Sequence, residues 1–169
     1  MNSVTTAERE PPVPYIQRTR EKYDALGYDE FRWLASEPPA PWSPLRKPLA
    51  ESHLGLISTG GVYRNGQTAF SYKDDTTYRA IPTDVETSQL RATHFTYDLT
   101  DARTDINCVF PIDTLHRLVG EGAIKGLTQS FYTCMGGIYS QRRVREELVP
   151  ALVERCVDDE IDVVLLVPV

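Results

Sequence analysis

The sequence predicts an α/β fold with a mostly parallel, doubly wound sheet and helices on both faces. Three observations indicate this class. Short apolar runs at 53–61, 127–133 and 163–169 alternate with amphipathic stretches of helical period. The first two runs lead into glycine turns, which are typical of loops that follow strands. The last run, VVLLVPV, is apolar on both faces, as a central parallel strand must be. This order of strands and helices is typical of Rossmann-like and flavodoxin-like sheets.

Two segments are expected before this domain. Residues 1–14 are polar and contain prolines, which predicts a mobile tail. Residues 15–48 form an N-terminal helical segment and a connector. The stretch 15–35 predicts one or two short helices broken near Gly27, whose aromatic side chains, Phe31 and Trp33 among them, are expected to pack on the main domain or another subunit. Five prolines between residues 36 and 48 predict a stiff connector.

The α/β domain is expected over 49–169. The run 53–61 reads as a buried strand that ends in Thr-Gly-Gly, and 62–91 reads as a long loop without periodicity. The alternating segment 93–98 predicts a strand, and 127–133 predicts another. A helix over 111–122 can begin at Pro111 and end at Gly120 or Gly122. A final amphipathic helix precedes the last strand, and Pro150 is expected to kink or restart it.

Charge and composition exclude several classes of function. A formal net charge of −6 and a pI of about 5.1 argue against nucleic acid or an anionic membrane as the main partner. No apolar run approaches the roughly 20 residues of a membrane span, and the N-terminus lacks the apolar core of a secretory signal. These absences favour the cytoplasm. The odd number of cysteines, without a Cys-x-x-Cys pair, argues against a disulfide framework or a structural zinc site.

Two groups of residues are candidates for chemistry. The carboxyl ends of parallel strands meet at one edge of a sheet, where glycine loops let the backbone approach a ligand. This edge would gather Thr59, Gly60 and Gly61 with Cys134, Met135, Gly136 and Gly137, although the glycines are also explained by tight turns. The segment from His94 to Cys108 combines a histidine with several carboxylates and suits proton transfer or metal binding. The alternative for that segment is a solvated loop with Asx turns.

A longer pattern resembles a known family. The runs PWSPLRKPLAESHLGLISTGGVYRNGQ, SYKDDTTYRAIPTD, THFTYDLTDARTDINCVFPIDTLHRLVGEGAIKGL and SFYTCMGG are similar to the selenoprotein B family of glycine, sarcosine and betaine reductases, over roughly 40–169. The resemblance implies that the last strand leads directly into a selenocysteine or cysteine. We therefore expect selenocysteine, encoded by an in-frame UGA, immediately after Val169, followed by a further helix and strand.

The resemblance also implies roles for the candidate residues. His94 is expected to be a proton donor or substrate contact, and Asp105 and Asn107 to position its loop. Cys134 ends a strand at the same sheet edge, so it is either a resolving thiol for the selenolate or a packed core residue. The substrate-binding positions implied are Thr59, Gly60, Gly61, Met135, Gly136 and Gly137. The implied function is a selenol- or thiol-dependent oxidoreductase subunit of the glycine or D-proline reductase type.

The expected reaction is reductive cleavage of a small amino-acid-like substrate. Its expected partners are a thioredoxin-like or other dithiol reductant and a second reductase subunit. No flavin, haem, zinc or nicotinamide site is evident in the sequence. Two alternatives remain open: a non-catalytic binding or scaffold subunit, and a small-molecule sensor that binds an anion at the glycine loops.

Overall fold

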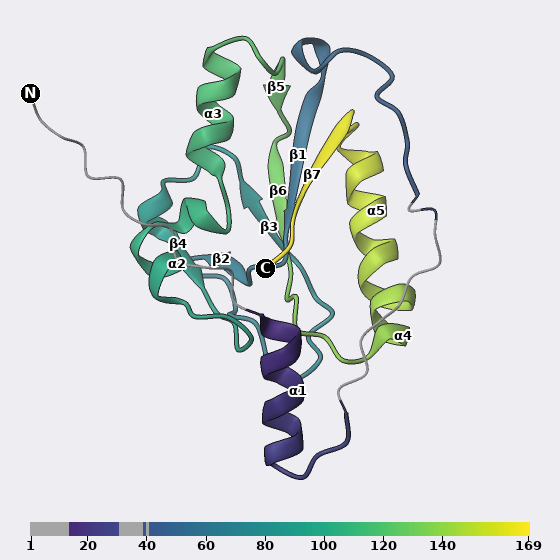
Figure 1. Ribbon diagram of the computed structural model, residues 1–169. Coiled ribbons are helices and arrows are strands. Elements are labelled where there is room, and N and C mark those ends of the chain that lie inside the picture. Colours follow the sequence, from purple (N-terminus) through teal and green to yellow (C-terminus); the bar gives the residue numbers. More distant parts are fainter. Residues whose placement is uncertain (1–13, 31–38, 40) are drawn as a thin grey trace, which may run out of the picture. The chain divides into compact units, whose positions relative to one another are not determined.

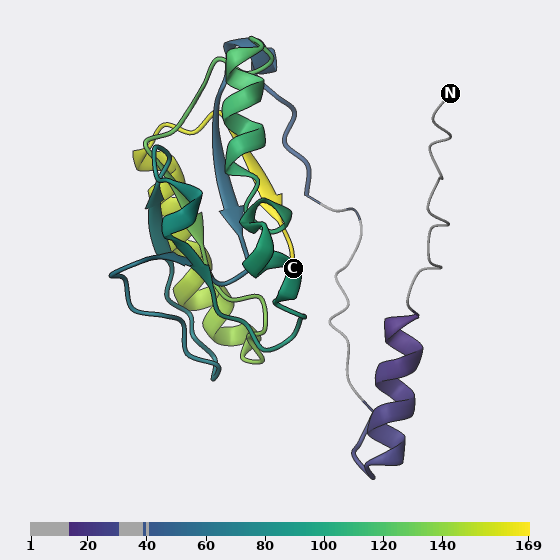
Figure 2. The same ribbon diagram turned by 90° about the vertical axis from the view of Figure 1, so that its left-hand side faces the viewer.

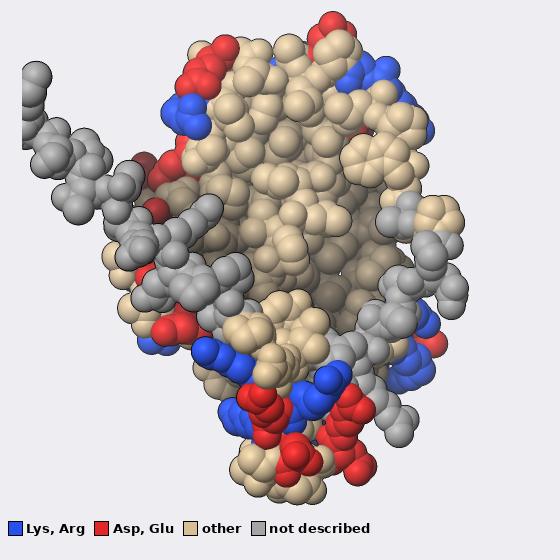
Figure 3. Space-filling view, in the orientation of Figure 1, with Lys and Arg blue, Asp and Glu red and all other residues tan. Residues whose placement is uncertain are grey.

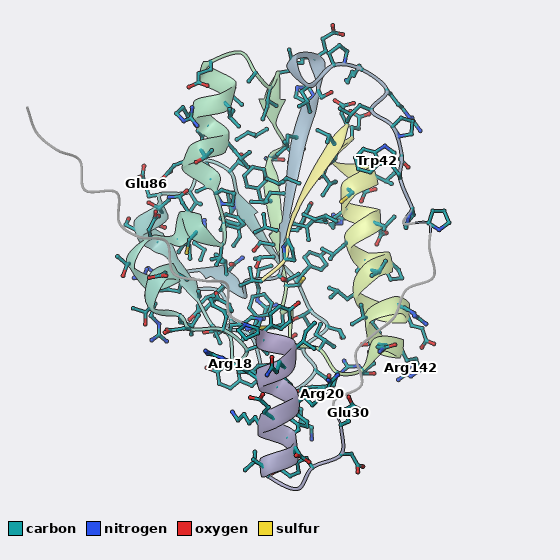
Figure 4. All side chains as sticks on the ribbon, viewed as in Figure 1. Arg18, Arg20, Glu30, Trp42, Glu86 and Arg142 are labelled. Atoms are coloured by element: carbon teal, nitrogen blue, oxygen red, sulfur yellow. The ribbon has the colours of Figure 1, made fainter. Side chains whose placement is uncertain are left out.

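The computed structural model describes residues 14–30, 39 and 41–169, in two units that are considered separately, 1–43 and 44–169 (Figure 1). The first unit holds helix α1 (Tyr15–Ala25), which buries none of its residues. Gly27, at φ +71°, ends the helix in a left-handed turn closed by the bond from Tyr28 N–H to the Tyr23 carbonyl. Arg20 and Glu30 form an exposed ion pair of 3.1 Å (Figure 4). The predictions for residues 1–13, Phe31 and Trp33 lie outside the described residues.

The second unit is built on a five-stranded sheet with β1 (His53–Ser58) inside it. On one side β1 pairs in parallel with β5 (Gly126–Leu127) and then with β6 (Ser130–Thr133). On the other side it pairs in parallel with β7 (Val163–Val167). The short strand β3 (Arg79–Pro82) runs antiparallel on the outer side of β6. The sheet is therefore mostly parallel, as predicted.

Side chains of β1 alternate between two cores. Leu54 and Leu56 belong to the larger core cluster, which contains Ile112 and Leu115 of helix α3 (Ile112–Gly120). Ile57 packs instead on the cluster formed with the C-terminal helix. Figures 1 and 2 show α3 and that helix on opposite sides of the sheet. An α/β fold is confirmed, whereas its assignment to the doubly wound class stays a prediction.

Helix α3 ends as the sequence predicts, and Gly122 rather than Gly120 carries the turn. Gly122 has φ +72°, and the N–H groups of Gly122 and Ala123 bond to the carbonyls of Val119 and Leu118 at 3.0 and 2.9 Å. This pair of bonds is a Schellman motif, which satisfies the last carbonyls of the helix.

The C-terminal helix is continuous but changes its winding. It consists of α4 (Gln141–Arg143), the π-helical turn η4 (Val144–Leu148) and α5 (Val149–Asp158). Pro150 lacks an N–H, and in an α-helix its ring would clash with the carbonyl four residues earlier. The wider π turn ends at Leu148, two residues before Pro150, and accommodates the ring. Arg142, at the start of this helix, pairs with Glu146 (Figure 4).

The region between β1 and α3 differs from expectation. The strand predicted at 93–98 is wrong: β4 (Leu90–Ala92) ends before it, and 93–98 is a bent loop. The segment 62–91, predicted to be irregular, contains β2 (Val62–Arg64), β3 and the 3-10 turn η2 (Thr87–Gln89). Strands β2 and β4 form a separate antiparallel pair. Further short helices are η1 (Leu49–Glu51), α2 (Thr100–Thr104) and η3 (Ile106–Cys108).

Candidate functional site

Three loops meet beyond the carboxyl ends of β1, β6 and β7. The N–H of Thr59 donates to the Val167 carbonyl at 3.0 Å, and the N–H of Val169 donates to Thr59 Oγ1 at 2.9 Å. The N–H of Gly61 donates to the Cys134 carbonyl at 3.0 Å. The structure thus brings together the strand ends that the sequence places at one edge of the sheet. We call these loops, 59–61, 134–137 and 168–169, the strand-end site.

The glycines of this site make close contact between the loops possible. Gly61 has φ +65°, and a Cβ there would lie 2.0 Å from the Thr93 carbonyl oxygen. A Cβ on Gly136 would lie 2.9 Å from the Val169 carbonyl oxygen and 3.0 Å from Thr59 Oγ1. The tight-turn interpretation of these glycines therefore has a direct basis in packing.

Only part of the site is accessible. Gly136 is exposed, and Thr59 and Gly137 are half-buried. The other predicted substrate-binding residues, Gly60, Gly61 and Met135, are buried. Those three residues therefore support the accessible part of the site without being exposed to solvent.

His94 lies under the site and joins two of its loops. Its side chain is 3 % exposed, and the N–H of Gly136 points to Nε2 at 3.2 Å. At the other ring nitrogen, Thr96 N–H and Oγ1 lie 3.1 and 2.9 Å from Nδ1, and a neutral ring accepts a hydrogen bond at only one of its two nitrogens. Burial lowers the pKa of His94, and a hydrogen bond with the Thr59 carbonyl opposes this shift. The imidazole is therefore neutral near neutral pH and holds the loops in place.

The same contacts explain why 93–98 is not a strand. His94 bonds to its own loop at Thr96, which bends the backbone. The Tyr97 hydroxyl donates to the Gly60 carbonyl at 2.9 Å, so its ring also turns inward. Burial raises the pKa of Tyr97, so its hydroxyl stays a donor. The alternation in THFTYD comes from a loop that buries His94, not from a pleated strand.

A buried serine attaches the next segment. Ser58 is fully buried at the end of β1; its hydroxyl donates to the Val109 carbonyl at 2.7 Å and accepts from Gly60 N–H at 3.1 Å. Neither Ser58 nor Tyr97 stands out in the sequence as a site residue. The signal for Ser58 was weak, a single hydroxyl group at the end of an apolar run.

Asp105 and Asn107 shape the turn before α3. Asp105 Oδ1 accepts from both the N–H and the Nδ2 of Asn107 at 3.0 Å, which lowers the pKa of Asp105. Asn107 Nδ2 also donates to Asp113 Oδ2 at 2.8 Å, and Asp113 N–H donates to Asn107 Oδ1 at 3.0 Å. No hydrogen bond joins either residue to His94 within the described chain. They position the 105–113 segment, which Ser58 fastens to the strand end.

Cys134 lies in a hydrophobic core. It is 3 % exposed among Tyr132, Leu148 and Leu152, and burial raises the pKa of its thiol to about 11. Thiol exchange proceeds through the thiolate, which is scarce at neutral pH for such a group. Packing accounts for Cys134 in this structure, and its proposed resolving role needs the thiol to become exposed.

Exposed aromatic rings stand beside Gly137. Phe95 is 38 % exposed, and its ring centroid lies 5.9 Å from Tyr72 and 6.4 Å from Tyr139. Asp74 fixes this arrangement, because its Oδ1 accepts from the N–H of Tyr139 at 2.7 Å. A Cβ on Gly137 would lie 2.6 Å from the Phe95 ring. The rings give the strand-end site an apolar rim.

Two features of the described residues bear on other functions. No group of three or more His, Cys, Asp or Glu residues in the described chain is arranged to hold a metal ion. Within that same part of the chain, no helix is both long and apolar enough to cross a membrane.

Comparisons with known proteins identify the family. Residues 40–168 match the family model of glycine/sarcosine/betaine reductase selenoprotein B. The chain is 34 % identical over 129 residues to the D-proline reductase subunit gamma of Acetoanaerobium sticklandii. The aligned residues make up 76 % of this chain and 53 % of that protein. The chain therefore spans about half the length of the curated relative it matches. No solved structure matches. The match over most of the chain shows that this protein belongs to the glycine/sarcosine/betaine reductase selenoprotein B family.

Proposed function

We propose that this chain is part of a selenol- or thiol-dependent reductase subunit that cleaves a small amino-acid-like substrate. Membership of the reductase family and the similarity to a D-proline reductase subunit support this assignment. In the net reaction the cleaved bond of the substrate, C–N, C–S or similar, takes up two electrons and two protons, so each of its two atoms gains a hydrogen. A dithiol reductant supplies the electrons and protons and becomes a disulfide.

The placement of Val169 carries the proposal. Val169 is bonded to Thr59, and its carbonyl oxygen lies beside Gly136. A residue following Val169 would therefore emerge among the accessible parts of the strand-end site. We propose that this residue is a selenocysteine or cysteine and supplies the nucleophile. The family relative, of which the chain covers 53 %, is long enough to include such a residue and a further helix and strand.

Residues of the present chain would prepare this position. Thr59 and Gly136 hold the end of β7, and Phe95 and Tyr139 offer an apolar wall to the substrate. His94 keeps the loops in register and is proposed as a proton donor or substrate contact. For His94 to donate a proton or to contact the substrate, the Gly136 loop must move, because the His94 side chain is buried in this structure.

The proposed partners follow from the same assignment. The relative is named as one subunit of D-proline reductase, so we propose a second reductase subunit. A dithiol of thioredoxin type would be the electron donor, in the cytoplasm, where thiols stay reduced.

Two measurements test the function. The first is the codon after Val169 in the gene: UGA or a cysteine codon followed by matching sequence supports the proposal, and UAA or UAG refutes it. The second is substrate-dependent oxidation of dithiothreitol by the complete polypeptide with its co-purified subunits. Changing the residue after Val169 to alanine should abolish this oxidation.

A scaffold function is the second candidate, favoured by the exposed edge of β7. In the described chain β7 pairs only with β1, while Leu166 is 65 % exposed and Val157 on α5 is 69 % exposed. Figure 3 shows that the surface over β7 is free of Lys, Arg, Asp and Glu side chains. An unpaired parallel edge can accept a strand from another polypeptide. A complete polypeptide that binds its partner but never oxidises dithiol would favour this function.

A further inference from the structure

A cavity of about 590 Å³ lies between the β2–β4 pair and the α2–η3 segment. Its apolar wall is formed by Leu90, Ala102 and Ile106, which are 5 %, 3 % and 7 % exposed. Small-molecule sites in proteins commonly have volumes of roughly 300–1,000 Å³, with apolar walls and a few placed polar groups. The size and the fixed wall of this cavity therefore suit a small ligand.

Two arginines give the cavity its charge. Arg91 Nη1 donates to the carbonyls of Ser88 and Leu90 at 2.8 and 2.6 Å, which fixes the side chain and leaves its other N–H groups available. Neither Arg91 nor Arg103 forms an ion pair with any described residue. The positive charge of Arg103 lowers the pKa of Asp98 and opposes the rise in the pKa of Tyr97, and its side chain forms no hydrogen bond to either residue.

The carboxylate among the lining residues already accepts hydrogen bonds from the protein. Asp105 is the single carboxylate among the described lining residues, and both hydrogen bonds to its Oδ1 come from Asn107. The lining thus carries two positive charges and one negative charge, in a chain whose net charge is −6. The remaining polar lining residues carry hydroxyl groups, although that of Thr104 already donates to the Thr100 carbonyl at 3.0 Å: Tyr63, Thr87, Ser88, Thr93 and Thr104.

We propose that this cavity binds a small organic anion, whose carboxylate or phosphate group lies between Arg91 and Arg103. Guanidinium groups bind such oxyanions with two parallel hydrogen bonds. The hydroxyls of Tyr63 and Thr93, 3.5 Å apart, complete the polar side, and the apolar wall takes the body of the ligand. The proposal does not depend on the reductase function, although Thr93 N–H donates to the Gly61 carbonyl at 3.0 Å and so joins the cavity to the strand-end site.

Isothermal titration calorimetry on the complete polypeptide, at constant ionic strength, tests the proposal. The probes are inorganic phosphate, succinate and the uncharged succinamide. We expect one-to-one binding of phosphate or succinate, with the preferred probe identifying the oxyanion, and no binding of succinamide. Arg103→Gln should weaken binding about tenfold or more, because the variant loses the charge-assisted hydrogen bonds of the guanidinium to the oxyanion.

Arg64→Gln is the matched control, because Arg64 is an exposed arginine of β2 outside the cavity lining. Its affinity should equal that of the unchanged protein. Arg103 makes no side-chain hydrogen bond to the described chain, so Arg103→Gln should fold normally even if Arg91→Gln does not. Absence of saturable binding to both anions, or equal weakening by Arg103→Gln and Arg64→Gln, would overturn the proposal.

Discussion

The backbone N–H of Val169 donates a hydrogen bond of 2.9 Å to the hydroxyl of Thr59, which lies 110 residues earlier in the chain. This bond fixes the end of β7 against the loop that follows β1. It also places the Val169 carbonyl beside Gly136, so the position after Val169 is defined by contacts on two sides.

Replacing Thr59 tests how much this placement matters. Thr59→Val keeps the shape of the side chain but removes the acceptor for Val169, so we expect a loss of about 1 kcal/mol in unfolding free energy. Turnover by the complete polypeptide should fall by a larger factor, because the proposed nucleophile loses its position. Thr59→Ser retains the hydroxyl and should restore turnover; equal turnover in the valine and serine variants would contradict the role of this bond.

Gly61 and Gly66 form a matched pair for testing close packing at the site. Both have positive φ, +65° and +91°, but a Cβ on Gly61 meets the Thr93 carbonyl at 2.0 Å, while one on Gly66 meets nothing within 4 Å. Gly66→Ala should cost about 1 kcal/mol of backbone strain. Gly61→Ala should cost clearly more, about 3 kcal/mol or above, because strain and overpacking add. Urea unfolding of both variants measures the difference, and similar losses would show that the loops can move apart.

The lowered pKa of His94 predicts a pH dependence of stability. The unfolded chain takes up a proton near the ordinary pKa of 6.5, whereas the folded chain does so only at lower pH. Stability should therefore decrease as the pH falls below about 6.5, since the unfolded state then binds more protons. The structurally bonded carboxylates, such as Asp105 and Asp162, have lowered pKa values and lose their contribution only in more acidic solution.

The His94→Gln variant isolates this effect. Urea unfolding between about pH 7.5 and pH 5 should give a steeper loss of stability in the unchanged protein than in the variant. His94→Gln itself should be less stable at neutral pH, so the comparison concerns the slopes. Identical slopes would mean that His94 titrates normally in the folded protein.

Glu160 is a position where a single change should stabilise the protein. It has φ +50° and occupies the left-handed position of a Schellman motif, with Ile161 N–H bonded to the Cys156 carbonyl at 3.1 Å. Gly122 occupies the equivalent position after α3. Glu160→Gly should raise the unfolding free energy by about 1 kcal/mol, and Gly122→Ala should lower it by a similar amount. Thermal unfolding measures both, and a destabilised Glu160→Gly protein would contradict this account of the turn.

The parts of the fold that sequence predicts are those with strong local signals. Strands β1, β6 and β7 are apolar runs, and α3 combines a helical period with a proline start and a glycine end. Strands β2, β3 and β4 are three or four residues long, and their pairing is non-local, as between Val62 and Ala92. Such strands depend on tertiary contacts, which one short stretch of sequence does not contain.

In the candidate site, too, features with local sequence signals can be predicted, whereas those that depend on tertiary contacts cannot. Parallel strand ends must meet at one edge, so the glycine loops could be placed in advance. The links through Ser58 and Tyr97 could not, because each joins a side chain to a distant carbonyl. The burial of Cys134 was likewise decided by α5, whose Leu152 packs in the same cluster.

The most direct test of the central claim is to locate the group whose alkylation stops turnover. The complete polypeptide would be reduced, treated with iodoacetamide, assayed for substrate-dependent dithiol oxidation and mapped by mass spectrometry. We predict that activity is lost in step with modification of the residue directly after Val169, while Cys134 stays unmodified in the folded protein because it is buried. Loss of activity in step with modification of Cys108, Cys134 or Cys156 instead would contradict the claim that the end of β7 presents the reactive group.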